Sequence, residues 1–141
     1  MLQETVLPLV PTGIRALIAD DHEDSARGLE MMLRMIGFET QIALDGIDAL
    51  RKAKTFKPML LLIDINMPKL DGFYTCGVIR VQPWAQQARV VAVTGYHDKN
   101  IETRSKEAGF DAFLLKPVDF SVLIRVIGEM LFQGNDVKTI L

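Results

Sequence analysis

The chain has 141 residues, of which 49% are hydrophobic and 24% are charged, the balance of one globular domain rather than of a disordered chain. Sixteen Lys and Arg against eighteen Asp and Glu leave a net charge of −2, which argues against a large electrostatic contact with nucleic acid. The single cysteine, Cys76, excludes an intramolecular disulfide and a multi-cysteine metal cluster.

The sequence also lacks the marks of a secreted or membrane protein. Its first residues carry Glu4, lack a basic start and are interrupted by Pro8 and Pro11, so they do not resemble a signal peptide. No apolar run approaches the roughly 20 residues that are needed to cross a bilayer. We therefore expect a soluble, cytoplasmic chain without a membrane partner.

The first part of the chain predicts two units of a strand followed by a helix. A buried strand over residues 14–19 is followed by a helix that Gly37 closes. A second strand over residues 40–44 leads to Asp45, which can cap a helix that ends before Pro58. The apolar residues at helical spacing are Leu29, Met32, Leu33 and Ile36 in the first helix and Ile47, Leu50 and Ala53 in the second.

The rest of the chain predicts three further strands. Residues 59–65 are the most apolar run, and a loop after them leads into a weak helix over residues 73–80. The fourth strand covers residues 89–95, and the helix over residues 99–108 that follows it has only two apolar members. After a fifth strand over residues 111–117, the last helix has an inner face of Leu123, Val126, Ile127 and Met130.

This alternation predicts a doubly wound α/β fold. Strands that are apolar throughout and separated by helices are typical of a parallel sheet covered on both faces. In such sheets ligands bind outside the carboxyl ends of the strands. We expect one domain over residues 13–131, with residues 1–12 and 132–141 as extensions outside it.

Polar side chains lie at the ends of four predicted strands. Asp20 and Asp21 follow the first strand, Asp64 lies near the end of the third, Thr94 ends the fourth and Lys116 ends the fifth. Because parallel strands end at one edge of a sheet, we expect these five side chains to converge in one pocket. Crowded carboxylates need a counter-charge, which a hard cation such as Mg²⁺ and the lysine can supply.

A carboxylate in such a pocket can be the nucleophile of phosphoryl transfer and form an aspartyl phosphate. Asp64 is the natural acceptor, because it ends the central apolar strand. We expect Asp20 and Asp21 to hold the metal, Lys116 to pair with the phosphoryl group and Thr94 to hydrogen-bond to it.

Taken together, these segments resemble the receiver domain of two-component response regulators. The matching segments are DD at 20–21, DINMPKLDG at 64–72, TGY at 94–96 and LKP at 115–117. The resemblance implies a flavodoxin-like, five-stranded parallel sheet in the order 2-1-3-4-5. It also implies Mg²⁺-dependent phosphorylation of Asp64 by a phosphohistidine, with Mn²⁺ as an alternative metal, and slow self-dephosphorylation. The backbone carbonyl of Asn66 then completes the metal site, and the peptide bond before Pro117 is commonly cis.

The resemblance also implies a switch. Thr94 moves towards the phosphoryl group and Phe113, three residues before Lys116, turns inward into the space left. The implied partners are a histidine kinase or histidine phosphotransfer protein and an unidentified output protein, with no direct contact with nucleic acid. The chain is then a signalling switch rather than an enzyme, either stand-alone or excised from a hybrid kinase or larger regulator.

Three alternative interpretations stay open at this point. A phosphatase of the haloacid dehalogenase type needs an acid two residues after the nucleophile, where this chain has Asn66. A flavodoxin-like cofactor binder needs a phosphate-binding loop after the first strand, where Asp20 and Asp21 would repel a phosphate. The third alternative, a structural pseudo-receiver, has the intact acidic set against it.

Two histidines have a plainer interpretation. His22 follows the acidic pair and His97 follows Tyr96, but neither belongs to a metal-ligand spacing, so we expect both to be surface loop residues. Gly95 stands where many receivers carry Ala, and we expect it to leave the acceptor open to small phosphodonors.

Overall fold

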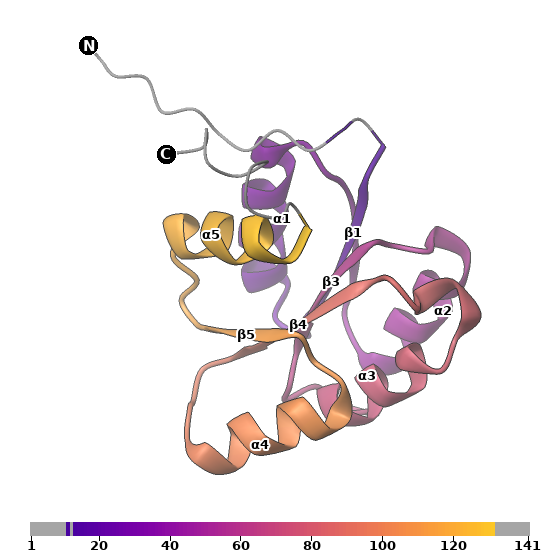
Figure 1. Ribbon diagram of the computed structural model, residues 1–141, viewed down its shortest axis with the longest axis vertical. Coiled ribbons are helices and arrows are strands. Elements are labelled where there is room, and N and C mark those ends of the chain that lie inside the picture. Colours follow the sequence, from indigo (N-terminus) through magenta and orange to yellow (C-terminus); the bar gives the residue numbers. More distant parts are fainter. Residues whose placement is uncertain (1–10, 12, 132–141) are drawn as a thin grey trace.

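The computed structural model describes residue 11 and residues 13–131, so nearly all of both expected extensions lies outside the described residues (Figure 1). The strands are β1 (Arg15–Ala19), β2 (Glu39–Ala43), β3 (Leu60–Asp64), β4 (Arg89–Thr94) and β5 (Ala112–Leu115). The helices are α1 (Glu23–Ile36), α2 (Gly46–Phe56), α3 (Gly72–Arg80), the short 3-10 helix η1 (Pro83–Ala85), α4 (Lys99–Ala108) and α5 (Phe120–Leu131). None of the helices in this part of the chain has the length and apolar character needed to cross a bilayer.

The strands form one parallel sheet in the order β2-β1-β3-β4-β5, which confirms the predicted fold. The register pairs Ala19 of β1 with Ile63 of β3, and Asp64 of β3 with Val93 of β4. Thr94 of β4 in turn pairs with Leu115 of β5. The last residues of four strands are therefore aligned at one edge of the sheet.

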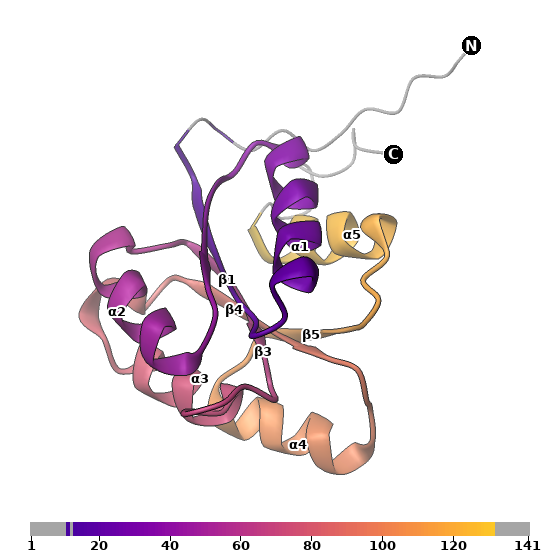
Figure 2. The ribbon, with the colours of Figure 1, turned by 180° about the vertical axis from the view of Figure 1, so that it is seen from behind.

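Two apolar clusters cover the two faces of the sheet. Helices α1 and α5 lie on one face, and α2 and α3 lie on the other (Figures 1 and 2). Every residue of β3 is buried, and its side chains alternate, with Leu60 and Leu62 facing α1 and α5 and with Leu61 and Ile63 facing the other side. Burying each such side chain is worth about 1.5–3 kcal/mol. The burial of these side chains therefore holds β3, and with it Asp64 at its end, firmly in the core.

Helix α4 is packed more lightly than the other helices, as its sequence indicates. Asp98 caps it by accepting a hydrogen bond from the Ile101 N–H at 2.8 Å, and Ser105 is the residue of the helix that is buried. Ile101 and Ala108 pack against the core while partly buried, and the guanidinium of Arg104 lies 4.2 Å from the centre of the Phe73 ring in α3. Few apolar contacts are typical of segments with low local stability.

The expected inner face of α2 is wrong in one residue. Ile47 is 47% exposed, and the buried residues of this helix are Gly46, Ala49 and Ala53. A Cβ atom on Gly46 would lie 2.5 Å from the Leu70 carbonyl oxygen, so only glycine allows this close approach. The approach fixes the rotation of the helix and turns Ile47 towards solvent. Strand boundaries differ from the predicted ones by one residue at most, except at the end of β5, which stops two residues earlier than expected.

Candidate functional site

The acidic residues predicted from the strand ends lie together. Ligand oxygens of Asp20, Asp21 and Asp64, together with a ring nitrogen of His22, all lie within 4.8 Å of one another. Asp20 is 1% exposed and Asp64 is 5% exposed, whereas the side chain of Asp21 is 28% exposed. The structure thus forms an acidic pocket with a buried floor and an open mouth at the carboxyl ends of β1 and β3.

Backbone hydrogen bonds orient the two buried carboxylates. The His22 N–H donates to Asp20 Oδ1 at 2.9 Å, and the Asn66 N–H donates to Asp64 Oδ1 at 3.0 Å. In both cases the donor lies two residues after the acid, as in the turns that Asp favours at the end of a strand. One oxygen of each carboxylate is therefore fixed, and the other oxygen faces the pocket.

Lys116 provides the positive charge of the pocket. Its Nζ atom lies 2.8 Å from Asp20 Oδ2 and 3.3 Å from Asp64 Oδ2. It follows β5 and precedes Pro117 across a cis peptide bond. The lysine, which follows the edge strand β5, thus contacts both buried carboxylates at the ends of β1 and β3.

The pocket shifts the pKa values of its members in different directions. Burial raises the pKa of Asp64, and the charge of Asp20 adds to this rise against the opposing effects of the Asn66 N–H and Lys116. Burial also acts to raise the pKa of Asp20, but Lys116 and the His22 N–H outweigh it and lower that pKa. The pKa of Lys116 is raised, because its two carboxylate partners outweigh its own burial. Asp20 is therefore the main partner of the lysine. The ionised form of Asp64 is less favourable than that of Asp20.

The donor set of the pocket fits a divalent cation. Asp20 Oδ2 and Asp21 Oδ1 are buried and have no hydrogen-bond donor with good geometry among the described residues. The Lys116 ammonium lies 2.8 Å from Asp20 Oδ2. Unsatisfied carboxylate oxygens are the ligands that Mg²⁺ prefers, and Asn66 lies at the exposed start of the adjoining loop. These residues can therefore hold Mg²⁺ with oxygen ligands.

Thr94 ends β4 at the sheet edge that carries the pocket, and Phe113 lies in the adjoining strand β5. The fully buried Thr94 hydroxyl donates to the Tyr96 carbonyl oxygen at 2.9 Å and accepts from the Tyr96 N–H at 3.1 Å. The ring of Phe113 is partly buried and stacks on the ring of His97, with centroids 4.8 Å apart. Both predicted switch residues are thus bound to the loop between β4 and α4.

The sequence interpretation missed how His22 is placed. Its side chain is 73% exposed, as expected for a surface residue, yet Nδ1 lies 3.4 Å from Asp21 Oδ1 and 3.6 Å from Asp20 Oδ1. The only available signal was its position directly after the acidic pair. His97, the second histidine, lies on the separate β4–α4 loop.

Comparisons with known proteins agree with this geometry. The family model for the response regulator receiver domain matches residues 16–128. The transcriptional regulatory protein PrrA of Mycobacterium tuberculosis is 34% identical over 128 residues, which cover 91% of this chain and 54% of PrrA. Protein PilG of Pseudomonas aeruginosa is 29% identical over 82% of this chain and 85% of its own. The chain therefore spans about half the length of PrrA but most of PilG.

Solved structures share the fold. Chemotaxis protein CheY4 of Vibrio cholerae superposes with a TM-score of 0.81 at 24% identity, over 85% of this chain and 100% of that one. The receiver domain of the sensor histidine kinase PA1611 of Pseudomonas aeruginosa superposes with a TM-score of 0.77 at 27% identity, over 84% of this chain and 98% of that one. That domain was described with a magnesium ion coordinated in its active site cleft. By its sequence and its fold, this chain belongs to the response regulator receiver domain family.

Proposed function

We propose that this receiver domain accepts a phosphoryl group on Asp64 from a phosphohistidine, and that the modified domain binds its output partner differently. The observation that carries the proposal is the position of Asp64. It is buried at the end of the central strand, with Lys116 3.3 Å from one oxygen and an acidic pair beside it. A carboxylate with a raised pKa next to a fixed ammonium is suited to act as a nucleophile whose product is more negative than the starting group.

The residues of the pocket described above are sufficient for the proposed transfer. An oxygen of Asp64 attacks the phosphorus atom, the P–N bond to the donor imidazole breaks, and the imidazole leaves with that electron pair. Lys116 holds its positive charge beside the attacking carboxylate and can follow the phosphoryl oxygens. Asp20, Asp21, Asp64 and the Asn66 carbonyl would hold Mg²⁺ or Mn²⁺, which supplies neutralisation of the phosphoryl charge.

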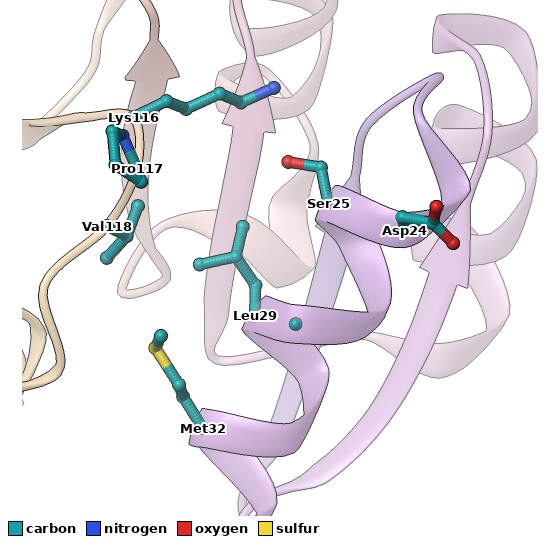
Figure 3. Close-up of a pocket in the computed structure, with 8 residues that line it drawn as sticks. Asp24, Ser25, Leu29, Met32, Lys116, Pro117 and Val118 are labelled. Carbon is teal, nitrogen blue, oxygen red and sulfur yellow. The ribbon is translucent and has the colours of Figure 1, made fainter.

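A groove beside the pocket is the place where we propose that the donor protein binds. It has a volume of about 390 Å³ and lies between α1 and the segment after β5. Figure 3 shows Lys116 extending its ammonium across the top, with Leu29 and Met32 of α1 facing Val118 below it. Asp24 and Ser25, at the start of α1, also line the groove. The groove includes Lys116, which lies 3.3 Å from the acceptor carboxylate of Asp64, so a helix that binds in it can bring a histidine towards the acceptor.

The proposed switch begins at Thr94. A phosphoryl group on Asp64 adds between one and two negative charges, to which the Thr94 hydroxyl can donate only after leaving the Tyr96 carbonyl. Phe113 then turns inward, guided by packing because it has no hydroxyl group. Because α4 is lightly packed, the surface formed by α4, β5 and α5 can change at low energetic cost.

The partners follow from this role. We infer a histidine kinase or a histidine phosphotransfer protein as the donor and a protein as the recipient of the output. The net charge of −2 argues against direct binding to nucleic acid. A donor that obtains its phosphoryl group from cellular ATP places the reaction in the cytoplasm.

The test is intact-mass measurement after incubation with Mg²⁺ and a small phosphodonor. Acetyl phosphate and phosphoramidate, which contains the P–N bond of a phosphohistidine, should each add one phosphoryl group to the wild-type chain. Asp64→Asn should remove the adduct, and Asp21→Asn should raise the Mg²⁺ concentration that is required. Fluorescence of Trp84 is a poor alternative readout, because this residue precedes β4 and the acceptor lies at the other end of the strands.

Asp24→Asn is the matched control, because Asp24 is an exposed acid that does not belong to the group of carboxylates in the acidic pocket. This variant should be phosphorylated like the wild type. An adduct that persists in Asp64→Asn would overturn the acceptor assignment. A wild-type chain that binds Mg²⁺ but stays unmodified by both donors would overturn the proposed function.

A further inference from the structure

The imidazole of His22 lies at the mouth of the acidic pocket and faces its carboxylates. Nδ1 is 3.4 Å from Asp21 Oδ1 and 3.6 Å from Asp20 Oδ1, and a ring nitrogen of His22 lies within 4.8 Å of a carboxylate oxygen of Asp64. The Asp21 oxygen is one of the two buried carboxylate oxygens without a well-formed hydrogen bond among the described residues. The ring is thus near a carboxylate oxygen that accepts no well-formed hydrogen bond from the described residues.

Helix capping does not explain this position of the ring. His22 is the N-cap residue of α1, yet its side chain makes no capping hydrogen bond. The residues favoured at that position are Ser, Thr, Asp and Asn, whose side-chain oxygens accept from the helix. The backbone N–H of His22 is the group that holds Asp20, at 2.9 Å. The imidazole is therefore free to serve as a ligand.

The distances fit ligands that share one metal ion. In protein sites zinc lies about 2.1 Å from nitrogen and carboxylate oxygen ligands, so two ligands at tetrahedral angles are separated by about 3.4 Å. The separations of the His22 nitrogen from Asp21 and Asp20 are 3.4 and 3.6 Å. The backbone therefore already places these donors as they would stand around an ion.

We propose that His22 is a nitrogen ligand that allows the pocket to bind a divalent transition metal such as Zn²⁺ or Co²⁺, in addition to Mg²⁺. The proposal rests on the cation site of the proposed function and extends it. Imidazole raises the affinity for transition metals, whereas Mg²⁺ is bound through oxygen. The transition metal uses Asp20, Asp21 and His22 with Asp64, and it competes with Mg²⁺ for the same carboxylates.

The composition of the chain makes the assignment simple to test. The sequence holds two histidines and one cysteine. Cys76 is buried in the core, and burial raises the pKa of its thiol to about 11. His97 lies in the β4–α4 loop, where it stacks on Phe113. Among the described residues, His22 is consequently the one histidine or cysteine at the acidic pocket, and His97 is its matched control.

The experiment is calorimetric titration of the full chain with MgCl₂, CoCl₂ and ZnCl₂, together with the visible absorption of bound Co²⁺. The variants are His22→Phe, which keeps an aromatic ring without a donor, and His97→Phe. We expect His22→Phe to weaken Co²⁺ and Zn²⁺ binding by about tenfold or more and to change the Co²⁺ spectrum. Mg²⁺ affinity should change by less than about twofold. His97→Phe should bind all three metals like the wild type.

The outcomes separate this proposal from the proposed function. Unchanged Co²⁺ affinity and an unchanged spectrum in His22→Phe would overturn the ligand role, even if the chain binds Mg²⁺ and is phosphorylated. An equal loss of Mg²⁺ and Co²⁺ affinity would also overturn it, because it would indicate a general effect on the loop. A wild-type chain that binds Co²⁺ through His22 but accepts no phosphoryl group would support this proposal and contradict the proposed function.

Discussion

The imidazole ring of His97 stacks on the phenyl ring of Phe113, with centroids 4.8 Å apart and planes inclined by 27°. This contact joins the β4–α4 loop to β5. The same loop is held a second time by the two hydrogen bonds between the Thr94 hydroxyl and the backbone of Tyr96. The residues proposed to move on phosphorylation are therefore tied to one loop by one stack and one pair of hydrogen bonds.

Removing the stack should loosen this loop without unfolding the domain. An aromatic pair is worth about 1 kcal/mol, so His97→Ala should speed amide hydrogen exchange by roughly fivefold in residues 95–102. Hydrogen exchange followed by mass spectrometry measures this directly. His22→Ala serves as the control and should leave exchange in these residues unchanged. Equal exchange in His97→Ala and the wild type would contradict a holding role for the stack.

The fold could be predicted from the sequence because its strongest signals are local. Five apolar runs of strand length, separated by helical patterns, determine a parallel sheet, and every residue of β3 is indeed buried. The convergence of Asp20, Asp64 and Lys116 also followed, because parallel strands end at one edge. Both predictions depend only on residue order and on general rules of sheet topology.

What could not be predicted depends on contacts between distant segments. Ile47 has the right helical spacing for the core, but the contact of Gly46 with Leu70 turns it outward. The direction of the His22 ring depends on the turn that the carboxylate of Asp20 makes with the backbone. No periodicity in a single sequence encodes such orientations. The position of His22 beside the acidic pair could therefore not be derived from strand ends alone.

The two buried carboxylates should affect stability with opposite signs. The raised pKa of Asp64 means that its ionised form is less favourable in the folded chain than in the unfolded chain. At neutral pH the ionised Asp64 therefore lowers the free energy of unfolding, and this loss is recovered as pH falls through the folded pKa. The lowered pKa of Asp20 means the reverse, because its contribution is present at neutral pH and is lost as pH falls through its folded pKa. Asp64→Asn should therefore stabilise the domain and Asp20→Asn should destabilise it.

Urea unfolding at pH 7 with a chelator present measures both effects, each of which should be on the order of 1 kcal/mol. The chelator is needed because bound metal would stabilise the wild type by mass action. In Asp64→Asn, Lys116 keeps its partner Asp20 at 2.8 Å, so no charge is left unpaired. A loss of stability in Asp64→Asn, equal to that in Asp20→Asn, would show that the assigned pKa directions are wrong.

Gly72 and Gly95 should respond differently to the same substitution. A Cβ atom on Gly72 would lie 2.5 Å from the Asp64 carbonyl oxygen and 2.7 Å from Ile65 Cα, and neither backbone atom can move aside. Gly72→Ala should cost about 1–3 kcal/mol and displace the end of β3. A Cβ atom on Gly95 meets nothing within 4 Å, so Gly95→Ala should change stability by less than about 0.5 kcal/mol.

The Gly95→Ala variant also tests whether Gly95 leaves the acceptor Asp64 open to small phosphodonors. Because Gly95→Ala should not disturb the fold, a change in its rate of phosphorylation by acetyl phosphate reports access to Asp64. We expect the added methyl group to slow both phosphorylation and hydrolysis. Unchanged rates in a normally folded Gly95→Ala would remove this role for the glycine.

Arg80 should be difficult to replace even by lysine. Its guanidinium donates to the Gly109 carbonyl oxygen at 2.8 Å and to the Ala88 carbonyl oxygen at 2.7 Å, and it pairs with Asp111. These partners belong to the segments that follow α4 and precede β4, so one side chain joins α3 to both. A lysine has one ammonium in place of the planar fork and cannot reach all three acceptors.

Arg80→Lys should therefore lower the free energy of unfolding by about 1–3 kcal/mol, because partly buried acceptors lose their donors. Urea unfolding gives the total, and hydrogen exchange should show the loss first at the end of α4. Arg27→Lys is the matched control, since Arg27 forms an exposed pair with Glu23 at 2.9 Å one turn away on α1. Exposed pairs of this kind contribute roughly 0.5 kcal/mol or less. Equal effects of the two substitutions would mean that Arg80 acts only as a surface charge and does not hold the segments around α4 together.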